Sequence, residues 1–146
     1  VLRKDFIVTE YQVLESRVLG ADLILLIVAA LTDSQLKDFY QLSTELGMDV
    51  LVEVHDLDEA EKALNIGSKI IGVNSRNLKT LEVSEKTFEL ILPQLPESVL
   101  KVAESGISTG EQVAKVQALG AKAVLIGESL VKSGNPVHTI NQLLNR

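Results

Sequence analysis

The segment Leu119-Gly-Ala-Lys-Ala-Val-Leu-Ile-Gly127 contains the pattern that predicts the fold. A leucine and a glycine end an amphipathic stretch, two residues form a turn, and an apolar run follows at once. The same arrangement precedes Leu23 and Ile70, and a close variant, Leu46-Gly-Met-Asp49, precedes Val50. Glycine commonly follows the last residue of a helix, so each copy predicts a helix, its C-cap, a tight turn and a strand.

Short apolar runs recur along the whole chain. They are rich in Val, Ile and Leu and lack polar alternation, which is typical of parallel strands covered on both faces. The runs are Val1–Leu2, Leu23–Val28, Val50–Val54, Ile70–Val73, Leu100–Ala103 and Ala123–Ile126. Because the chain opens on an apolar residue, we expect its first strand to extend over 1–6.

Amphipathic stretches between these runs predict six helices. Each begins at a residue that favours a helix N-terminus, and most end at a glycine. The predicted starts are Thr9, Thr32, Asp56, about Ser84, Ser108 and Pro136. Strands joined by helices predict a single α/β domain, residues 1–146, with a parallel sheet and right-handed crossovers.

Two architectures fit six strand–helix units. One is an open, doubly wound sheet. The other is a TIM (β/α)8 barrel that lacks two of its units. The composition suits both, since 46% of the residues are hydrophobic and 3% are aromatic, which predicts a core of Val, Leu, Ile and Ala.

The net charge and the counts of Cys and His limit the kinds of partner and of chemistry that we expect. The net charge is −6 and no basic residues cluster, so we expect no nucleic-acid partner. The chain has no Cys and two His, which argues against thiol chemistry and against a metal cluster. No apolar run reaches the roughly 20 residues of a membrane span, so we expect no membrane partner and a cytoplasmic location.

Polar or glycine residues stand at the ends of five of the six predicted strands, where catalytic groups cluster in parallel α/β folds. Any one of them could simply face solvent. Lys4 close to Glu53 and Glu104 would form an acid–base set whose members perturb one another. His55 lies two residues beyond Glu53, so we expect it on the same side but further out. The second strand alone ends in apolar residues, 27–31, which could wall a pocket.

Glycines follow the last two strands, at Gly106 and Gly127. Barrels commonly bind phosphate with the loops after their seventh and eighth strands, where glycine lets the backbone approach closely. A neutral backbone site would also explain how an acidic chain binds an anion. The alternative is that both glycines only serve tight turns.

At these residues the sequence resembles indole-3-glycerol-phosphate synthase, and the resemblance covers the whole chain. The segments that carry it are Val1-Leu-Arg-Lys-Asp-Phe6, Gly47-Met-Asp-Val-Leu-Val-Glu-Val-His55, Ile70-Ile-Gly-Val-Asn-Ser-Arg-Asn-Leu78, Val102-Ala-Glu-Ser-Gly-Ile107 and Val124-Leu-Ile-Gly-Glu-Ser129. The first three together are the specific ones. The fourth also occurs in other phosphate-binding barrels.

The resemblance implies a carboxy-lyase of tryptophan biosynthesis that needs no cofactor. Its substrate is a phosphorylated small molecule, 1-(2-carboxyphenylamino)-1-deoxyribulose 5-phosphate, which closes a ring with loss of CO2 and water to give indole-3-glycerol phosphate. Lys4 would be the general acid, and Glu53 the general base or partner carboxylate, although Glu104 is also a plausible base. The remaining roles implied are substrate orientation by Asn74, Glu104 and Ser105, phosphate binding by Gly106, Gly127 and the backbone N–H of Glu128, and a flanking role for Arg76.

The family's barrel has eight strands, and the strand that carries Lys4 corresponds to its third. We therefore expect an incomplete barrel of six βα units that lacks the first two, with little or no activity alone. A complementing N-terminal fragment or a second copy could close it. The alternatives are an inert barrel fragment that acts as a folding or assembly module, another phosphate-binding barrel enzyme, and a flavodoxin-like regulatory domain.

Overall fold

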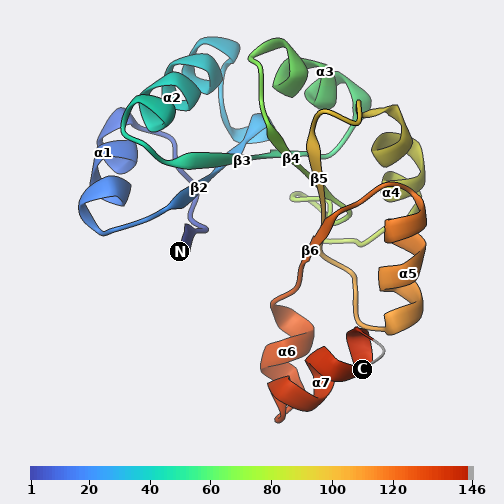
Figure 1. Cartoon of the computed structure of the whole chain (residues 1–146). Helices are drawn as coiled ribbons and strands as arrows, with labels where there is room; N and C mark the ends of the chain where they lie inside the picture. The colour runs from blue at the N-terminus through green and yellow to red at the C-terminus, as the bar shows by residue number, and fades with distance from the viewer. Residues whose placement is uncertain (145–146) are drawn as a thin grey trace. The chain divides into compact units, whose positions relative to one another are not determined.

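A computed structural model describes residues 1–144 of the chain. It contains two compact units, Val1–Gly72 and Val73–Arg146, and strands alternate with helices in both (Figure 1). A single domain over residues 1–146 stays a prediction. None of the helices in the described part is long and apolar enough to cross a membrane.

The first unit is a parallel sheet with its helices packed against the strands (Figure 1). Strand β1 pairs with β2 from Leu2 opposite Leu23, and β2 pairs with β3 from Leu23 opposite Asp49. All but the first residue of β2 and of β3 are buried, which explains why both read as unbroken apolar runs. The elements are β1 (Leu2–Arg3), α1 (Glu10–Val18), β2 (Leu23–Ile27), the 3-10 helix η1 (Val28–Ala30), α2 (Asp33–Glu45), β3 (Asp49–Val54) and α3 (Leu57–Asn65).

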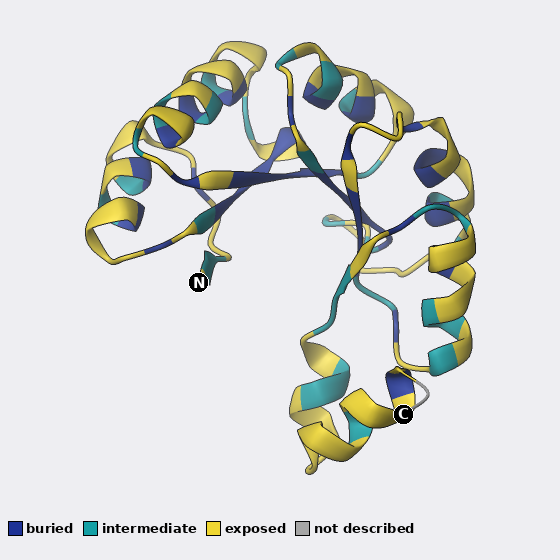
Figure 2. Cartoon of the chain, in the orientation of Figure 1, coloured by how far each residue is buried: buried dark blue, intermediate teal, exposed yellow. Residues whose placement is uncertain are grey.

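The second unit continues the alternation. Strand β4 (Ile70–Asn74) contains the boundary between the units, and β5 pairs in parallel with β6 from Val102 opposite Ala123. Figure 2 shows that the last two helices are largely exposed, although Leu143 is buried. The remaining elements are α4 (Lys86–Ile91), the 3-10 helix η2 (Leu92–Gln94), β5 (Leu100–Glu104), α5 (Gly110–Ala118), β6 (Ala123–Leu125), α6 (Glu128–Lys132) and α7 (Pro136–Leu143).

Side-chain caps fix where the helices begin. Thr9, Thr32 and Thr109 each accept a hydrogen bond from the backbone of a Gln three residues later, and that Gln side chain bonds back to the cap. Two otherwise unsatisfied N–H groups are thus served at each start. The glycines after α1, α2, α3 and α5 all have positive φ, as the repeated Leu-Gly or Ile-Gly motif predicts.

Besides shifts of one or two residues at other element ends, four details differ from the sequence-based expectation. The first strand covers only Leu2–Arg3 instead of 1–6, because the chain then turns toward α1. The second strand ends at Ile27, and Val28–Ala30 form a 3-10 helix. Helix α4 begins at Lys86, and residues 84–85 precede it. The described residues contain one α-helix more than the six that were predicted. This additional helix is α6, and at five residues it is too short to show helical periodicity.

The capping box of α2 gives a direct test of this local account. Thr32→Ala should lower the free energy of unfolding by about 1 kcal/mol, because the backbone N–H of Gln35 loses its acceptor. Urea unfolding followed by circular dichroism measures the change. Lys37→Ala, at an exposed position of the same helix, is the matched control and should change it by less than about 0.5 kcal/mol. Equal effects of the two substitutions would contradict the capping role.

Candidate active site

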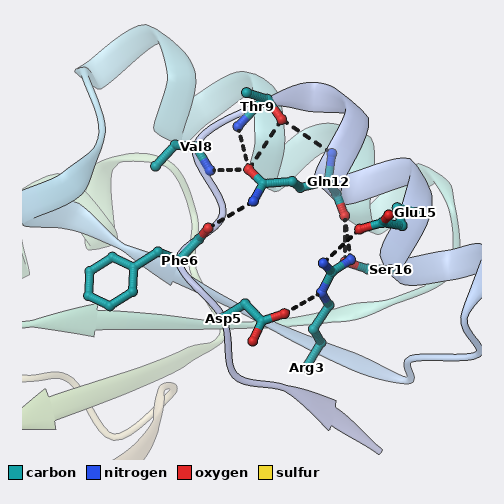
Figure 3. A network of polar contacts seen from close by, with 8 residues as sticks. All are labelled: Arg3, Asp5, Phe6, Val8, Thr9, Gln12, Glu15 and Ser16. Carbon is teal, nitrogen blue, oxygen red and sulfur yellow. Dashed lines mark hydrogen bonds and ion pairs between the residues drawn. The ribbon is translucent and has the colours of Figure 1, made fainter.

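Lys4 lies just after β1. The residues on either side of it, Arg3 and Asp5, belong to the network of polar contacts in Figure 3. The guanidinium of Arg3 donates to Asp5 Oδ2 at 2.9 Å, to Glu15 Oε2 at 2.7 Å and to Ser16 Oγ at 3.2 Å. Glu15 and Ser16 belong to α1, so the hydrogen bonds of the Arg3 guanidinium connect the end of β1 to the helix that follows it. The backbone at Lys4 is therefore fixed from both sides.

Gln12 fixes the rest of the turn between β1 and α1 (Figure 3). Its side-chain amide donates to Phe6 O at 3.1 Å, and its Oε1 accepts from the backbone N–H of Val8 at 2.8 Å and of Thr9 at 3.1 Å. Because one side chain satisfies three backbone groups, the loop that carries Lys4 has a defined path without being regular structure.

Four side chains of the first unit form a charged group that we call the Glu53 cluster: Lys4, Glu53, His55 and Glu59. Glu53 is only 1% exposed, and its two oxygens face different cations. Lys4 Nζ lies 3.4 Å from Oε2, and His55 Nε2 lies 3.4 Å from Oε1. His55 Nδ1 lies 3.0 Å from Glu59 Oε2 on the other side. An ionised carboxylate at this depth requires such compensation.

His55 carries a positive charge at neutral pH. Burial acts to lower the pKa of its ring, but the carboxylates of Glu53 and Glu59 beside it outweigh burial and raise the pKa to about 9. The cluster therefore alternates in sign along Lys4, Glu53, His55 and Glu59. A carboxylate lies on each side of the ring: Nδ1 is within hydrogen-bond distance of Glu59, whereas Nε2 makes only a charge contact with Glu53.

In the second unit, Ser75 joins the ends of β4 and β5. Its backbone N–H donates to Glu104 O at 3.0 Å, and its hydroxyl lies 3.0 Å from Ser105 O. Beside it, Asn74 is buried and its Oδ1 accepts from the backbone N–H of Arg76 at 2.9 Å. The carboxyl ends of these strands are thus locked together, and they carry the buried side chains of Asn74 and Glu104.

The turn after β5 requires glycine. Ser105 and Gly106 both have positive φ, at 66° and 68°. A Cβ on Gly106 would overlap Val83 Cγ1, which belongs to the loop that follows β4. Val83 forms an antiparallel bridge with Arg76, so this loop folds back on itself and its end packs on Gly106. The positive φ and the contact with Val83 show the tight-turn use of Gly106, while its predicted approach to phosphate stays a prediction.

A cavity of about 450 Å³ opens at these turns, and we call it the Gly106 pocket. Its walls are Arg76, Val83 and the segments 105–108 and 125–129. Five predicted site residues therefore border one space: Arg76, Ser105, Gly106, Gly127 and Glu128. Its size suits a small-molecule group such as a phosphate and its attached carbon chain.

Glu128 is held at the pocket by two cations. Its carboxylate lies 2.7 Å from Lys132 Nζ and 2.8 Å from Arg76 Nη2. The hydrogen bond with Lys132 and the charges of Lys132 and Arg76 lower the pKa of this carboxyl. Arg76 is thus the cation that borders the pocket, and a carboxylate already contacts it.

The structure groups the predicted residues within each unit. Lys4 and Glu53 meet in the first, and Asn74, Arg76 and the glycine turns gather in the second. Convergence of the two groups on one substrate stays a prediction. Sequence reasoning missed Ser75 and Glu59 and gave His55 no role. The spacing of His55 and Glu59, four residues apart across the start of a helix, was the available signal for that pair.

Fold and site together define an α/β protein of the parallel barrel class, with a buried cluster of charged side chains in one unit and a glycine-lined pocket in the other. A sequence model described as indole-3-glycerol phosphate synthase matches residues 1–143. The chain belongs to this family, whose members are lyases of tryptophan biosynthesis.

Curated relatives agree with the family. The chain is 50% identical over 143 residues to indole-3-glycerol phosphate synthase of Nocardioides sp. (strain ATCC BAA-499 / JS614), which covers 98% of this chain and 55% of the relative. It is 51% identical over 144 residues to indole-3-glycerol phosphate synthase 1 of Streptomyces coelicolor, covering 99% and 54%. The chain therefore spans about half the length of these relatives.

A solved structure supports the fold class. The tryptophan synthase α2β2 complex from Pyrococcus furiosus contains a chain that matches with a TM-score of 0.76 and 17% identity, over 99% of this chain and 66% of its own length. The predicted class, an incomplete TIM barrel of alternating strands and helices, is confirmed, and the open doubly wound sheet is set aside.

The charge on His55 makes stability depend on pH. Between the ordinary histidine pKa of about 6.5 and the folded value of about 9, the native state binds a proton that the unfolded state has lost. The free energy of unfolding should therefore fall as pH rises through this window, by at most roughly 3 kcal/mol.

Urea unfolding between pH 6 and 10 measures this fall. His55→Gln should remove most of the slope, whereas His138→Gln, at an exposed position on α7, should keep it. A free energy of unfolding that does not change with pH in the unsubstituted chain would contradict a raised pKa of His55 in the Glu53 cluster.

Proposed function

We propose that this chain supplies acid–base and substrate-binding residues for the indole-3-glycerol-phosphate synthase reaction. In that reaction the carboxyphenylamino-deoxyribulose phosphate closes a ring and loses CO2 and water. The observation that carries the proposal is the buried carboxylate of Glu53 on β3 facing the ammonium of Lys4, which follows β1; both strands pair in parallel with β2. Family membership supports the choice of reaction.

The first unit holds the groups that move protons. Lys4 acts as general acid: its ammonium protonates the substrate carbonyl as the ring closes, or, once it has regained a proton from solvent, the departing hydroxyl. A cation beside the reacting carbonyl oxygen stabilises the negative charge that develops there. Glu53 accepts the proton that is lost in the dehydration step. Its buried position keeps water away from that transfer.

The second unit holds the substrate. Asn74, Glu104 and Ser105 orient the hydroxyls and the anthranilate portion. The phosphate occupies the Gly106 pocket, where Gly106 and Gly127 let the backbone approach it and the N–H of Glu128 donates. Arg76 borders the same pocket and supplies a positive charge there.

We also propose a partner segment that completes the barrel. In the first unit, β2 is the strand that pairs with β1 among the described residues, so β1 is an edge strand there. Helix α1 exposes an apolar stripe of Tyr11, Leu14 and Val18. In the second unit β6 is paired with β5. Edge strands and an exposed apolar helix face are the features that added βα units would cover.

The reaction itself is tested by following indole fluorescence. The chain is mixed with the substrate alone, and again with a fragment that supplies the two βα units which precede the matching region in a relative. We expect product with the added fragment and little or none without it. Lys4→Ala should lower the rate by roughly 100-fold or more, since it removes the general acid.

Lys79→Ala, at an exposed loop position, is the control substitution and should leave the rate unchanged. Product formation that survives Lys4→Ala at full rate would contradict the role of Lys4. No product with or without the fragment, while a relative's intact enzyme is active in the same assay, would contradict the proposed function of this chain.

The Gly106 pocket gives an independent prediction. Glu128→Gln should tighten binding of inorganic phosphate by roughly 3- to 10-fold, because it removes a carboxylate that repels the anion and already engages Arg76. Arg76→Met should weaken the same binding. Isothermal titration calorimetry measures both, with Glu111→Gln on α5 as a control for net charge. Equal effects of Glu128→Gln and Glu111→Gln would show that phosphate binds elsewhere.

A further inference from the structure

We propose that His55 is a positioning residue for this reaction: held as a cation between Glu59 and Glu53, it fixes one oxygen of Glu53 and leaves the other facing Lys4. The inference rests on the proposed function, which assigns proton acceptance to Glu53. It adds a residue that does not itself contact substrate and acts through the carboxylate next to it.

Glu59 anchors the ring from the helix side. The backbone N–H of His55 donates to Glu59 Oε2 at 2.8 Å, and ring Nδ1 lies 3.0 Å from the same oxygen. Glu59 is in turn fixed at the start of α3, where its backbone N–H donates to Asp56 Oδ1 at 2.8 Å. One carboxylate oxygen thus binds both the backbone and the ring of His55, so the ring has little freedom to turn.

The ring presents its other nitrogen to Glu53. Nε2 lies 3.4 Å from Oε1, while Lys4 Nζ lies 3.4 Å from Oε2. The last torsion of a Glu side chain is intrinsically broad, so a carboxylate is not oriented by its own rotamer. Two cations on opposite oxygens orient it instead. The Glu53 side chain is 2% exposed and that of His55 is 16% exposed, so water screens this contact weakly.

The charges that face the ring come from neighbouring elements. Strand β3 supplies Glu53, the first turn of α3 supplies Glu59, and the loop after β1 supplies Lys4 beside Glu53. The 3-10 helix η1, which packs on both β3 and α3, consists of Val28, Ala29 and Ala30 and adds no titratable side chain. Carboxylates therefore dominate around the ring, which favours its cationic form.

A cationic ring whose Nδ1 is bound to Glu59 and whose Nε2 lies 3.4 Å from Glu53 is poorly suited to be the proton acceptor. The raised pKa of His55, about 9, means that it holds its proton throughout the neutral range. Instead, the ring can favour the ionised form of Glu53 and fix the orientation of its carboxylate, with one oxygen facing Lys4. Without the ring, the buried carboxylate would lose the cation next to Oε1 and hold a proton more readily, so it would begin to accept protons from substrate only at higher pH.

The first experiment measures the proton on His55 directly. The chain has two histidines, so an NMR titration of the imidazole signals needs one variant, His138→Gln, to assign them. We expect the His55 signal to titrate near pH 9, and to titrate at lower pH in Glu59→Gln. A midpoint at or below the ordinary value of about 6.5 would overturn the inference.

The second experiment uses whichever preparation shows synthase activity and compares kcat and KM over pH. His55→Gln should lower kcat by roughly 10- to 100-fold, change KM little, and move the acid limb of the kcat profile to higher pH. Glu59→Gln should move the limb in the same direction by less, and it covers the case in which His55→Gln fails to fold. His138→Gln is the control and should behave as the unsubstituted protein.

The outcomes separate the two claims. An unchanged acid limb and kcat in both His55→Gln and Glu59→Gln would overturn the positioning role while the synthase activity stands. A rise in KM alone would also overturn it, since that result assigns His55 to substrate binding. If no preparation makes product, the proposed function fails, and the NMR titration then decides on its own whether His55 is the shared cation described.

Discussion

The carboxylate of Glu53 lies almost fully out of contact with water, and the local structure of the first unit depends on how that charge is compensated. A buried ionised carboxylate is costly unless opposite charges and hydrogen bonds replace its water. Lys4 and His55 provide those charges from opposite sides. Neither could do so if its own backbone were loose, because ordering a long side chain and a loop costs conformational entropy.

Each of the two cations is therefore anchored by a separate helix start. Hydrogen bonds from the Arg3 guanidinium and from the Gln12 side chain connect the loop that carries Lys4 to α1. Glu59, whose backbone N–H binds Asp56, connects His55 to α3. The second unit follows a different principle. There, Gly106 admits the side chain of Val83, and Arg76 faces a carboxylate at the edge of an open pocket. Proton transfer and anion binding thus belong to different units in the function proposed.

Much of the fold follows from short-range patterns that the sequence displays openly. The Leu-Gly and Ile-Gly turns, the Thr and Gln pairs at helix starts and the unbroken apolar strands are local signals, so their positions could be predicted to within a residue or two. Strand β1 is the exception: side-chain bonds of Arg3, not its apolar residues, decide where it stops. Helix α6 is too short to leave a periodic signal.

The candidate site was predictable only in part. Lys4, Glu53, Asn74 and Glu104 stand at strand ends, a place that topology marks without knowledge of contacts. Ser75 and His55 act through partners distant in sequence or across an element boundary, which spacing does not specify. Glu128 shows the same limit: its sequence position suggests phosphate binding, and the structure shows its carboxylate engaged by Arg76 and Lys132.

A crystal structure of the active preparation with bound indole-3-glycerol phosphate is the most direct test of the division between the two units. The phosphate is predicted to lie in the Gly106 pocket, within hydrogen-bond distance of the backbone at Gly106 or Gly127, with Lys4 and Glu53 at the indole end. A ligand whose phosphate lies outside that pocket, or that contacts neither Lys4 nor Glu53, would contradict it.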